Sequence, residues 1–381
     1  MTTISWPHCA GQQRVKEVLE AAIASNTLGH AYLFSGMEGC GKFAAALDLA
    51  LALLCEAKDS RPCMKCAACT KVLHYAHPDF HVIMPVAFPK KLQDDEEDLS
   101  KAEEWEYLSD RVKERITDAY RTPAYEKKPK IPVDWIRETN HAILRGPIEK
   151  NVNVVIFDAI DIMHDSPANT ILKTLEEPPA GTVLLLLTDR PSAVLPTIVS
   201  RCQIMRFSYL SPDEIRTHLC SRFSLDPSDK RLSDVIHTGS LGRSLYLWDH
   251  PAETVRNEAI VFWDLCAREN WQEIAECIDR LCEDGDYSFY EGLFMELIQL
   301  IRNAFLSELD GTDNLFSGDS SCAAAAGLPG MTSRAQTMWQ LINLCEHSIA
   351  AARAHGTMTL VLAYFALTVT EVLHGEKQQS R

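Results

Sequence analysis

The sequence predicts an α/β fold with a parallel sheet in its first half, followed by domains made of helices. A short apolar run at residues 31–34 enters a glycine turn, and an Ala- and Leu-rich helical pattern follows from Phe43 to Leu54. Strand, glycine turn and helix form the opening unit of a parallel sheet. Beyond residue 208 strand patterns fade and helical periodicity dominates, so the helical domains are expected there.

The remaining elements of the sheet domain follow in alternation. Apolar runs predict strands, and a 3.6-residue period predicts helices. Ser166-Pro167 favours a helix start, because the hydroxyl can cap the helix and proline suits its first position. The predicted strands are 152–158 and 183–188, and the predicted helices are 12–29, 132–144 and one from Ser166 to Pro178.

Residues 86–131 interrupt this alternation. An acidic run at 94–98 and a basic run at 127–130 flank a polar middle. We expect a surface insertion that is partly helical. Its role stays open, and its composition favours a solvated excursion without a dedicated role. Residues 320–330, rich in Ala, Ser and Gly, predict a loose connection.

The composition limits the class of protein. The 381 residues suffice for two or three compact units, and 46% hydrophobic with 24% charged residues is usual for a globular protein. No apolar run could span a membrane and no leader pattern opens the chain, so we expect a cytoplasmic protein. A net charge of −16 disfavours DNA binding by the chain alone, since phosphates attract positive charge. Contact with DNA inside a larger assembly stays open.

The glycine turn matches a phosphate-binding loop. Gly36 to Lys42 fits the pattern G-x-x-x-x-G-K, in which Gly36, Gly39 and Gly41 let backbone N–H groups surround a phosphate. The helix N-terminus adds partial positive charge, and Lys42 reaches the outer phosphates. Phe43, however, stands where a working loop has the Ser or Thr hydroxyl that binds Mg²⁺.

A second position shows the same loss. Asp158 ends an apolar strand, as does the carboxylate that holds the Mg²⁺ shell in such enzymes, but the next residue is Ala159 where a water-activating glutamate is expected. Asp161 lies too far along a short turn for that task, and Glu38 places a negative charge near the phosphate oxygens. The sequence therefore predicts weak or no ATP binding, no Mg²⁺, and no ATP hydrolysis by this chain on its own.

Four of the thirteen cysteines lie within fifteen residues. Cys55, Cys63, Cys66 and Cys69 have the spacing C-x7-C-x2-C-x2-C, which suits a closed tetrahedral Cys₄ site. We expect a structural zinc ion there, in a module at residues 55–69. Chance clustering and a redox role are the alternatives, and redox sites usually need only one C-x2-C pair.

Several motifs together resemble the bacterial clamp-loader family of DNA polymerase III, an AAA+ family that comprises the gamma/tau motor and its delta-prime relative. They are residues 30–34, the cysteine cluster, His77-Pro78-Asp79, the run 172–179 ending in Glu-Glu-Pro-Pro, and Ser200-Arg201-Cys202. The resemblance covers roughly residues 6–250 apart from the insertion. Because Phe43 and Ala159 remove what a motor needs, the chain is more similar to the delta-prime branch.

The resemblance implies a role for three further residues. Arg201 would be an arginine finger that acts in trans on ATP bound by a neighbour, Thr188 falls at the first sensor position, and Arg243 falls at the second. The implied domains are an AAA+ domain at 1–207, a helical lid at 208–250 and a helical collar at 251–381.

The resemblance also implies partners. These are the gamma/tau and delta subunits in a hetero-pentamer, with the β sliding clamp and primer–template DNA engaged through the complex and no membrane. The chain would be a non-hydrolysing stator. Two alternatives stay open: an active gamma/tau-like ATPase motor with an unusual loop, and a zinc-bearing scaffold in which Arg201 is only structural.

Overall fold

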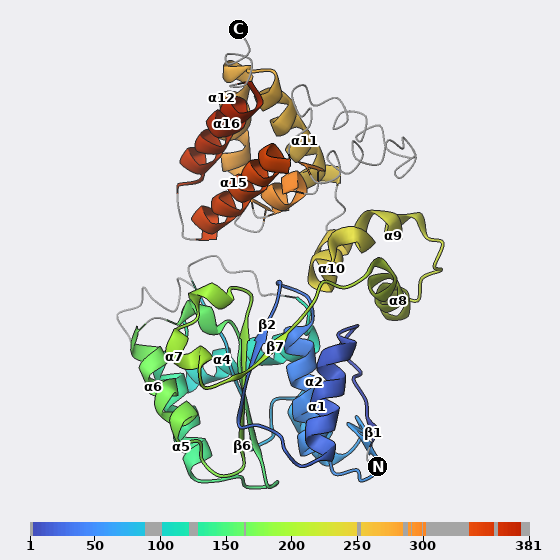
Figure 1. Cartoon of the computed structure of the whole chain (residues 1–381), viewed down its shortest axis with the longest axis vertical. Helices are drawn as coiled ribbons and strands as arrows, with labels where there is room; N and C mark the ends of the chain where they lie inside the picture. Colours follow the sequence, from blue (N-terminus) through green and yellow to red (C-terminus); the bar gives the residue numbers. More distant parts are fainter. Residues whose placement is uncertain are drawn as a thin grey trace. The chain divides into compact units, whose positions relative to one another are not determined.

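The chain divides into two compact units, residues 1–123 with 129–250 and residues 251–381 with 124–128 (Figure 1). The acidic run 94–98 and the connection 320–330 lie outside the described residues. A computed structural model describes residues 3–87, 101–121, 129–163, 165–249, 253–284, 289–290, 292–298, 300–301, 335–353 and 357–374.

A five-stranded parallel sheet forms the centre of the first unit, in the order β4-β5-β6-β2-β7. The strands are β2 Ala31–Ser35, β4 Phe80–Ile83, β5 Asn153–Phe157, β6 Thr182–Thr188 and β7 Gln203–Arg206. The predicted parallel sheet is confirmed. Ser35 pairs with Thr188, and Phe157 pairs with Leu186, so the carboxyl ends of the central strands meet at one edge. Open parallel sheets bind ligands at that edge.

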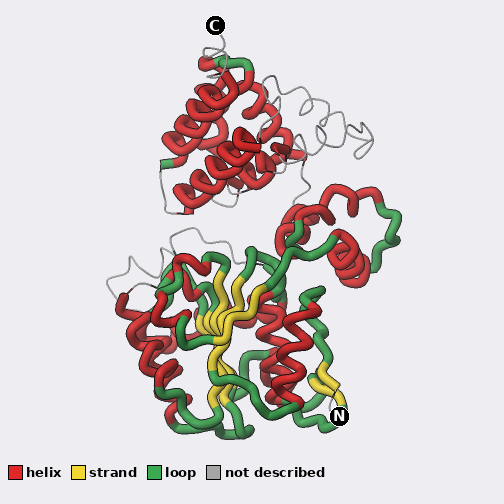
Figure 2. The backbone as a smooth tube through the Cα atoms, in the orientation of Figure 1, coloured by secondary structure: helices red, strands yellow, loops and turns green. Residues whose placement is uncertain are grey.

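Helices cover both faces of the sheet (Figures 1 and 2). Helices α1 Gln13–Ala24 and α2 Lys42–Leu54 lie on one face, and α5 Val133–Leu144 and α6 Asp165–Glu176 on the other. All seven residues of β6 are buried, which explains why its sequence is almost continuously apolar. Helix α2 is also buried nearly all round, as its Ala- and Leu-rich composition requires.

Several predicted boundaries differ from the structure, most of them by one residue. Helix α1 ends at Ala24 rather than near residue 29, because Asn26 adopts a left-handed conformation with φ of 55°. Helix α6 begins at Asp165, one residue before the predicted Ser166 cap. The shorter elements are β1 Thr3–Ile4, β3 Ser60–Arg61, α3 Ala67–Leu73, η2 Ile160–Ile162, η3 Pro191–Ala193 and α7 Pro196–Val199.

The insertion contains helix α4, Lys101–Thr117, followed by a turn to residue 121. Leu108, Val112 and Ile116 form an apolar stripe at i, i+4 spacing and are all buried. The expectation of a helix is correct, but the expectation of a solvated excursion is wrong for α4. Val86 and Lys130 exchange two backbone hydrogen bonds of 3.0 and 2.9 Å, so the two ends of the insertion lie side by side.

Three helices, which we name the lid after the predicted domain, complete the first unit. They are α8 Pro212–Phe223, α9 Lys230–Val235 and α10 Leu241–Asp249, with the turn η4 Ile236–Thr238. A capping box starts α8, in which the Ser211 hydroxyl accepts from the Glu214 N–H and the Glu214 carboxylate accepts from Ser211. Such reciprocal caps satisfy backbone donors that a helix start leaves unpaired.

The second unit is helical where it is described. Its helices are α11 Glu253–Ala267, α12 Trp271–Asp284, α15 Ala335–Arg353 and α16 Met358–His374. Helix α16 contacts α11, α12 and α15. Three fully buried rings lie in this core, with the Phe365 ring 6.0 Å from that of Phe262 and 5.1 Å from that of Phe294.

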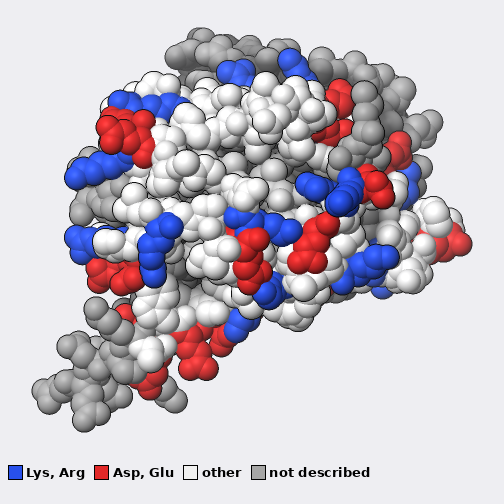
Figure 3. Space-filling view, turned by 90° about the horizontal axis from the view of Figure 1, so that it is seen from below, with Lys and Arg blue, Asp and Glu red and all other residues white. Residues whose placement is uncertain are grey.

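The surface carries charges of both signs. Figure 3 shows Lys and Arg side chains lying beside Asp and Glu over the visible face, which therefore presents no broad field of one sign. Lys71 and Glu149, for example, form an exposed ion pair of 2.5 Å. Within the described residues, no helix combines the length and the apolar composition that crossing a membrane requires.

Candidate functional site

The turn between β2 and α2 keeps the shape of a phosphate-binding loop. Gly39 and Gly41 have φ angles of 69° and 102°, which L side chains rarely adopt, and α2 begins directly at Lys42. A Cβ atom on Gly39 would lie only 2.4 Å from the Ser240 hydroxyl of the lid. The loop therefore needs glycine for its own conformation and for the close approach of the lid.

The loop lysine bonds to the loop itself. Lys42 Nζ donates 2.8 Å hydrogen bonds to the carbonyl oxygens of Gly36 and Met37. These carbonyls occupy two of the three ammonium donors that would otherwise reach the outer phosphates of a nucleotide. The lysine is thus bound to its own loop.

The two metal-binding positions are joined by an arginine from the insertion. Phe43 is buried, and the Arg115 guanidinium carbon lies 4.1 Å from the centre of its ring. Arg115 Nε donates a 2.9 Å hydrogen bond to the Asp158 carboxylate, which follows the end of β5. A cation therefore lies between the position of the missing hydroxyl and the carboxylate that would hold Mg²⁺.

Thr188, the predicted first sensor position, and the turn after β5 form a second polar cluster. The Thr188 hydroxyl donates to Asp161 Oδ1 at 2.8 Å, and Arg190 donates to Asp161 Oδ2 at 3.0 and 2.8 Å. Asp161 is buried, so these bonds compensate its charge. The Asp161 carboxylate is engaged by Thr188 and Arg190, while Ala159 offers no side-chain group that could activate water.

The lid is hydrogen-bonded to the loop. The Ser240 hydroxyl donates to the Glu38 carbonyl at 2.8 Å, and the Gly242 N–H donates to the Gly39 carbonyl at 3.1 Å. Arg243, the predicted second sensor position, lies over the Tyr246 ring with 5.2 Å between guanidinium carbon and ring centre. Loop and lid thus contact each other directly, once through a lid hydroxyl and once through the two backbones.

Arg201 belongs to a different part of the unit. It follows α7, and its guanidinium donates to the Glu176 carboxylate at 2.6 Å and to the Thr197 carbonyl at 2.8 Å. About a third of the side chain remains exposed, 35% by area. Glu176 belongs to the Glu-Glu-Pro-Pro run, so two motifs that resemble the family are joined by one ion pair.

The four clustered cysteines come together in space. Their sulfur atoms all lie within 4.8 Å of one another, and those of Cys55 and Cys66 are 4.0 Å apart. A tetrahedral zinc with bonds of about 2.3 Å would place pairs of sulfurs about 3.8 Å apart. The residues present therefore fit a zinc ion, and the spacing prediction has correctly selected residues that meet.

Backbone N–H groups favour thiolates at these sulfurs, whereas burial opposes them by raising the pKa of the Cys55 thiol. Cys55 Sγ accepts from the N–H groups of Ala57 and Cys63 at 3.4 Å, and Cys66 Sγ accepts from Cys69 at 3.5 Å. A backbone hydrogen bond from Lys65 lowers the pKa of the Cys63 thiol to about 6, whereas burial raises the pKa of Cys69. Thiolates are the form that binds metal.

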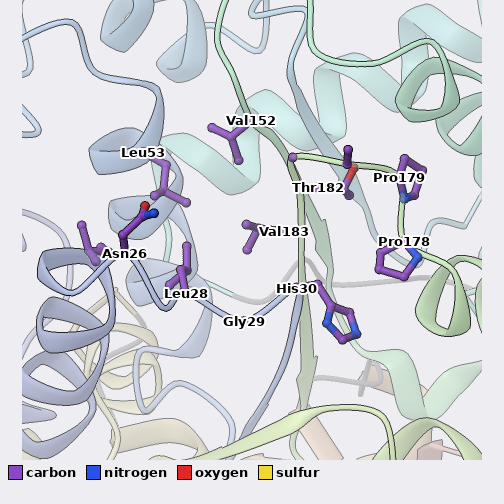
Figure 4. Close-up of a pocket in the computed structure, with 13 residues that line it drawn as sticks. Asn26, Leu28, Gly29, His30, Leu53, Val152, Pro178, Pro179, Thr182 and Val183 are labelled. Carbon is purple, nitrogen blue, oxygen red and sulfur yellow. The ribbon is translucent and has the colours of Figure 1, made fainter.

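A cavity of about 450 Å³ lies at the other edge of the sheet. Figure 4 shows side chains from the segments before β2, β5 and β6, including Leu28, Val152 and Pro179. The phosphate-binding loop follows the carboxyl end of β2, whereas this cavity adjoins the amino end. None of the predicted site residues lines the cavity.

The fold and the loop define an α/β protein of the phosphate-binding-loop class. Phe43 stands at the position of the metal-binding hydroxyl and Ala159 at that of the water-activating carboxylate, whereas Asp158 is retained. The family model described as DNA polymerase III, delta subunit, matches residues 11–211, more than half of the chain. The chain belongs to this family, and the predicted resemblance to the delta-prime branch of the bacterial clamp-loader family is confirmed.

Individual relatives agree with the family match. DNA polymerase III subunit delta′ of Bacillus subtilis is 30% identical over 57% of this chain and 54% of its own length. Subunit gamma/tau of Mycobacterium tuberculosis is 27% identical over 56% of this chain and 30% of its own length. Among solved structures, a gamma subunit-related protein from Thermotoga maritima aligns over 94% of this chain and 99% of its own, with 13% identity and a TM-score of 0.43. The matched region thus spans about half or less of these curated relatives.

Sequence reasoning missed Arg115, in the last turn of α4, and Tyr120, in the turn that follows. Arg115 contacts Phe43 and Asp158, and Tyr120 lies against the loop at Gly41. A signal was present, because Leu108, Val112 and Ile116 repeat with a helical period inside a polar segment. That stripe indicates a helix that packs on the body, although it does not indicate where.

Proposed function

We propose that this chain is a delta-prime-like subunit of a bacterial clamp loader that does not hydrolyse ATP itself. Arg201 would act in trans on ATP bound by a neighbouring subunit. The proposal rests on the contacts and the exposure of Arg201. Glu176 and Thr197 orient its guanidinium group, and 35% of its side chain is exposed. A planar, permanently charged guanidinium suits the charge that develops on a transferring phosphoryl group.

The chain's own loop supports the non-hydrolysing half of the proposal. Phe43 offers no metal ligand, Ala159 offers no base, and Asp158 is bonded to Arg115. The contrasting proposal, an active gamma/tau-like motor, requires the purified chain to hydrolyse ATP and to lose that activity in Lys42→Ala.

The partners follow from the relatives, which are DNA polymerase III subunits. We propose gamma/tau and delta subunits as neighbours in a hetero-pentamer, with the β sliding clamp and primer–template DNA engaged through the assembly in the cytoplasm. The domain at 1–207 would carry Arg201, the lid would span 208–250, and the collar at 251–381 would hold the subunits together. Zinc bound by the four cysteines would brace the segment between α2 and α3.

Arg201→Ala tests this function in a loader reconstituted with its gamma/tau and delta subunits. We expect the clamp- and DNA-stimulated ATPase rate to fall at least about tenfold, since arginine fingers contribute factors of about 10³ or more at one site. Arg201→Lys should recover little, because the planar fork is lost. Arg206→Ala, at an exposed position of β7, serves as the control and should leave the rate unchanged. An unchanged rate in Arg201→Ala would overturn the finger role.

A further inference from the structure

The turn that follows α4 lies against the phosphate-binding loop. A Cβ atom on Gly41 would lie 3.0 Å from the Tyr120 hydroxyl oxygen, so this ring adjoins the N-terminus of α2. That N-terminus is where a phosphate would bind. Tyr120 is also buried, with 4% of its surface exposed, which shows that the contact is closed to solvent.

Tyr120 contacts three further parts of the first unit. Its hydroxyl accepts a 2.7 Å hydrogen bond from the Ala10 N–H, ahead of α1. Its ring lies edge-on to His218 of α8, with 5.5 Å between centres. Its carbonyl oxygen lies 2.6 Å from where a Cβ on Gly242 would be. One residue therefore lies between the N-terminal segment, the loop and the lid.

Arg115 lies beside Phe43 and Asp158, close to the same loop. Its side chain is 9% exposed, and besides Asp158 it donates to the carbonyls of Ala119 at 2.7 Å and Arg121 at 3.2 Å. These bonds hold the turn after α4 in a fixed conformation. Phe43 supplies the ring beneath the guanidinium, so the residue that removes the metal ligand also favours the arginine.

The same segment is tied to the lid by ion pairs. Asp118 accepts from Arg222 of α8 at 2.8 Å, and Arg121 pairs with Asp249 at the end of α10. A nucleotide bound at the loop would have to lie between loop and lid. Residues 115–121, the occluding segment, fill that position with the chain's own atoms.

We propose that the occluding segment is a permanent intramolecular ligand of this chain's nucleotide pocket. Arg115 replaces the metal ion as the partner of Asp158, and Tyr120 covers the phosphate-binding N-terminus of α2. The lid is consequently held against the loop without nucleotide. This inference rests on the contacts of residues 115–121 and is independent of Arg201.

Nucleotide titration of the full chain tests the inference. We expect a fluorescent ATP analogue not to bind the wild-type chain at 1 mM or below, with or without Mg²⁺. The double variant Arg115→Met, Tyr120→Ala should bind it at least about tenfold more tightly than wild type, and equally well with EDTA, because Phe43 still excludes the metal ligand. Arg111→Met is the matched control, since Arg111 lies on the same helix and pairs with the exposed Glu114.

Two results would overturn the inference. One is micromolar binding by the wild-type chain, and the other is a folded double variant that still does not bind. If the double variant does not fold, hydrogen exchange of the wild-type chain decides. Backbone amides of residues 115–121 should be protected and unaffected by MgATP, whereas exchange that MgATP accelerates would show a segment that nucleotide displaces.

Discussion

Replacing Arg115 by Met should destabilise the first unit by about 3 kcal/mol. The hydrogen bond to Asp158 is charge-assisted and contributes about 1.5–3 kcal/mol, and the contact with the Phe43 ring adds about 0.5–2 kcal/mol. Only 9% of the Arg115 side chain and 18% of the Asp158 side chain are exposed, so solvent replaces little of what is lost. Breaking a buried ion pair at one partner typically costs about 3–5 kcal/mol, which agrees with this sum.

Replacing Asp158, the partner of Arg115, separates the free energy of the ion pair from that of the packing around Arg115. In an Asp158→Asn background no uncompensated carboxylate remains, so Arg115→Met should cost about 1.5 kcal/mol less than in wild type. Arg111→Met, which breaks an exposed pair on the same helix, should cost less than about 1 kcal/mol.

Amide exchange of β5 at increasing urea concentration measures these values, because it reports the first unit alone. Two-state analysis of the whole chain would mix the two units. The reasoning fails if Arg115→Met costs less than about 0.5 kcal/mol, or if its cost is the same with and without the Asp158 carboxylate.

Two further outcomes concern the metal cluster and pH. The chain should contain one zinc ion, and metal analysis should show that Cys63→Ser loses it. Cys202→Ser should keep the ion, because its sulfur lies outside the cluster. Equal metal content in the two variants would contradict the site. Burial lowers the pKa of His81 from 6.5 to about 4, so the folded state binds this proton more weakly and stability should fall as pH drops through that window. His81→Phe should lose less stability than wild type between pH 7 and 5 in urea denaturation, and parallel losses would refute this assignment.

Short sequence patterns were enough to predict the sheet and the phosphate-binding loop. Residues 36–42 and the apolar strands carry their structure in short, continuous segments, and the cysteine spacing is equally local. The ends of the helices were predicted less accurately than the strands. Helix α1 stops where Asn26 adopts a left-handed conformation, which has only a weak sequence signal.

The occupant of the pocket could not be predicted in the same way. Arg115 and Asp158 are separated by 43 positions, and Tyr120 and Ala10 by 110. Nothing in a polar segment indicates which distant surface its helix will contact. The missing hydroxyl at Phe43 was readable from one residue, whereas the contact of its ring with Arg115 required the fold.

The backbone pairing of Val86 with Lys130 affects how nucleotide would compete with residues 115–121 for the pocket. A group tethered beside its site is present there at an effective concentration of about millimolar or more, whatever the surrounding solution contains. Because the insertion both leaves and re-enters the body at one point, residues 115–121 cannot diffuse away from the pocket. To displace the segment, nucleotide would have to reach a concentration well above its own intrinsic dissociation constant. The conformation of this unit should then stay the same as the ratio of ATP to ADP changes around it.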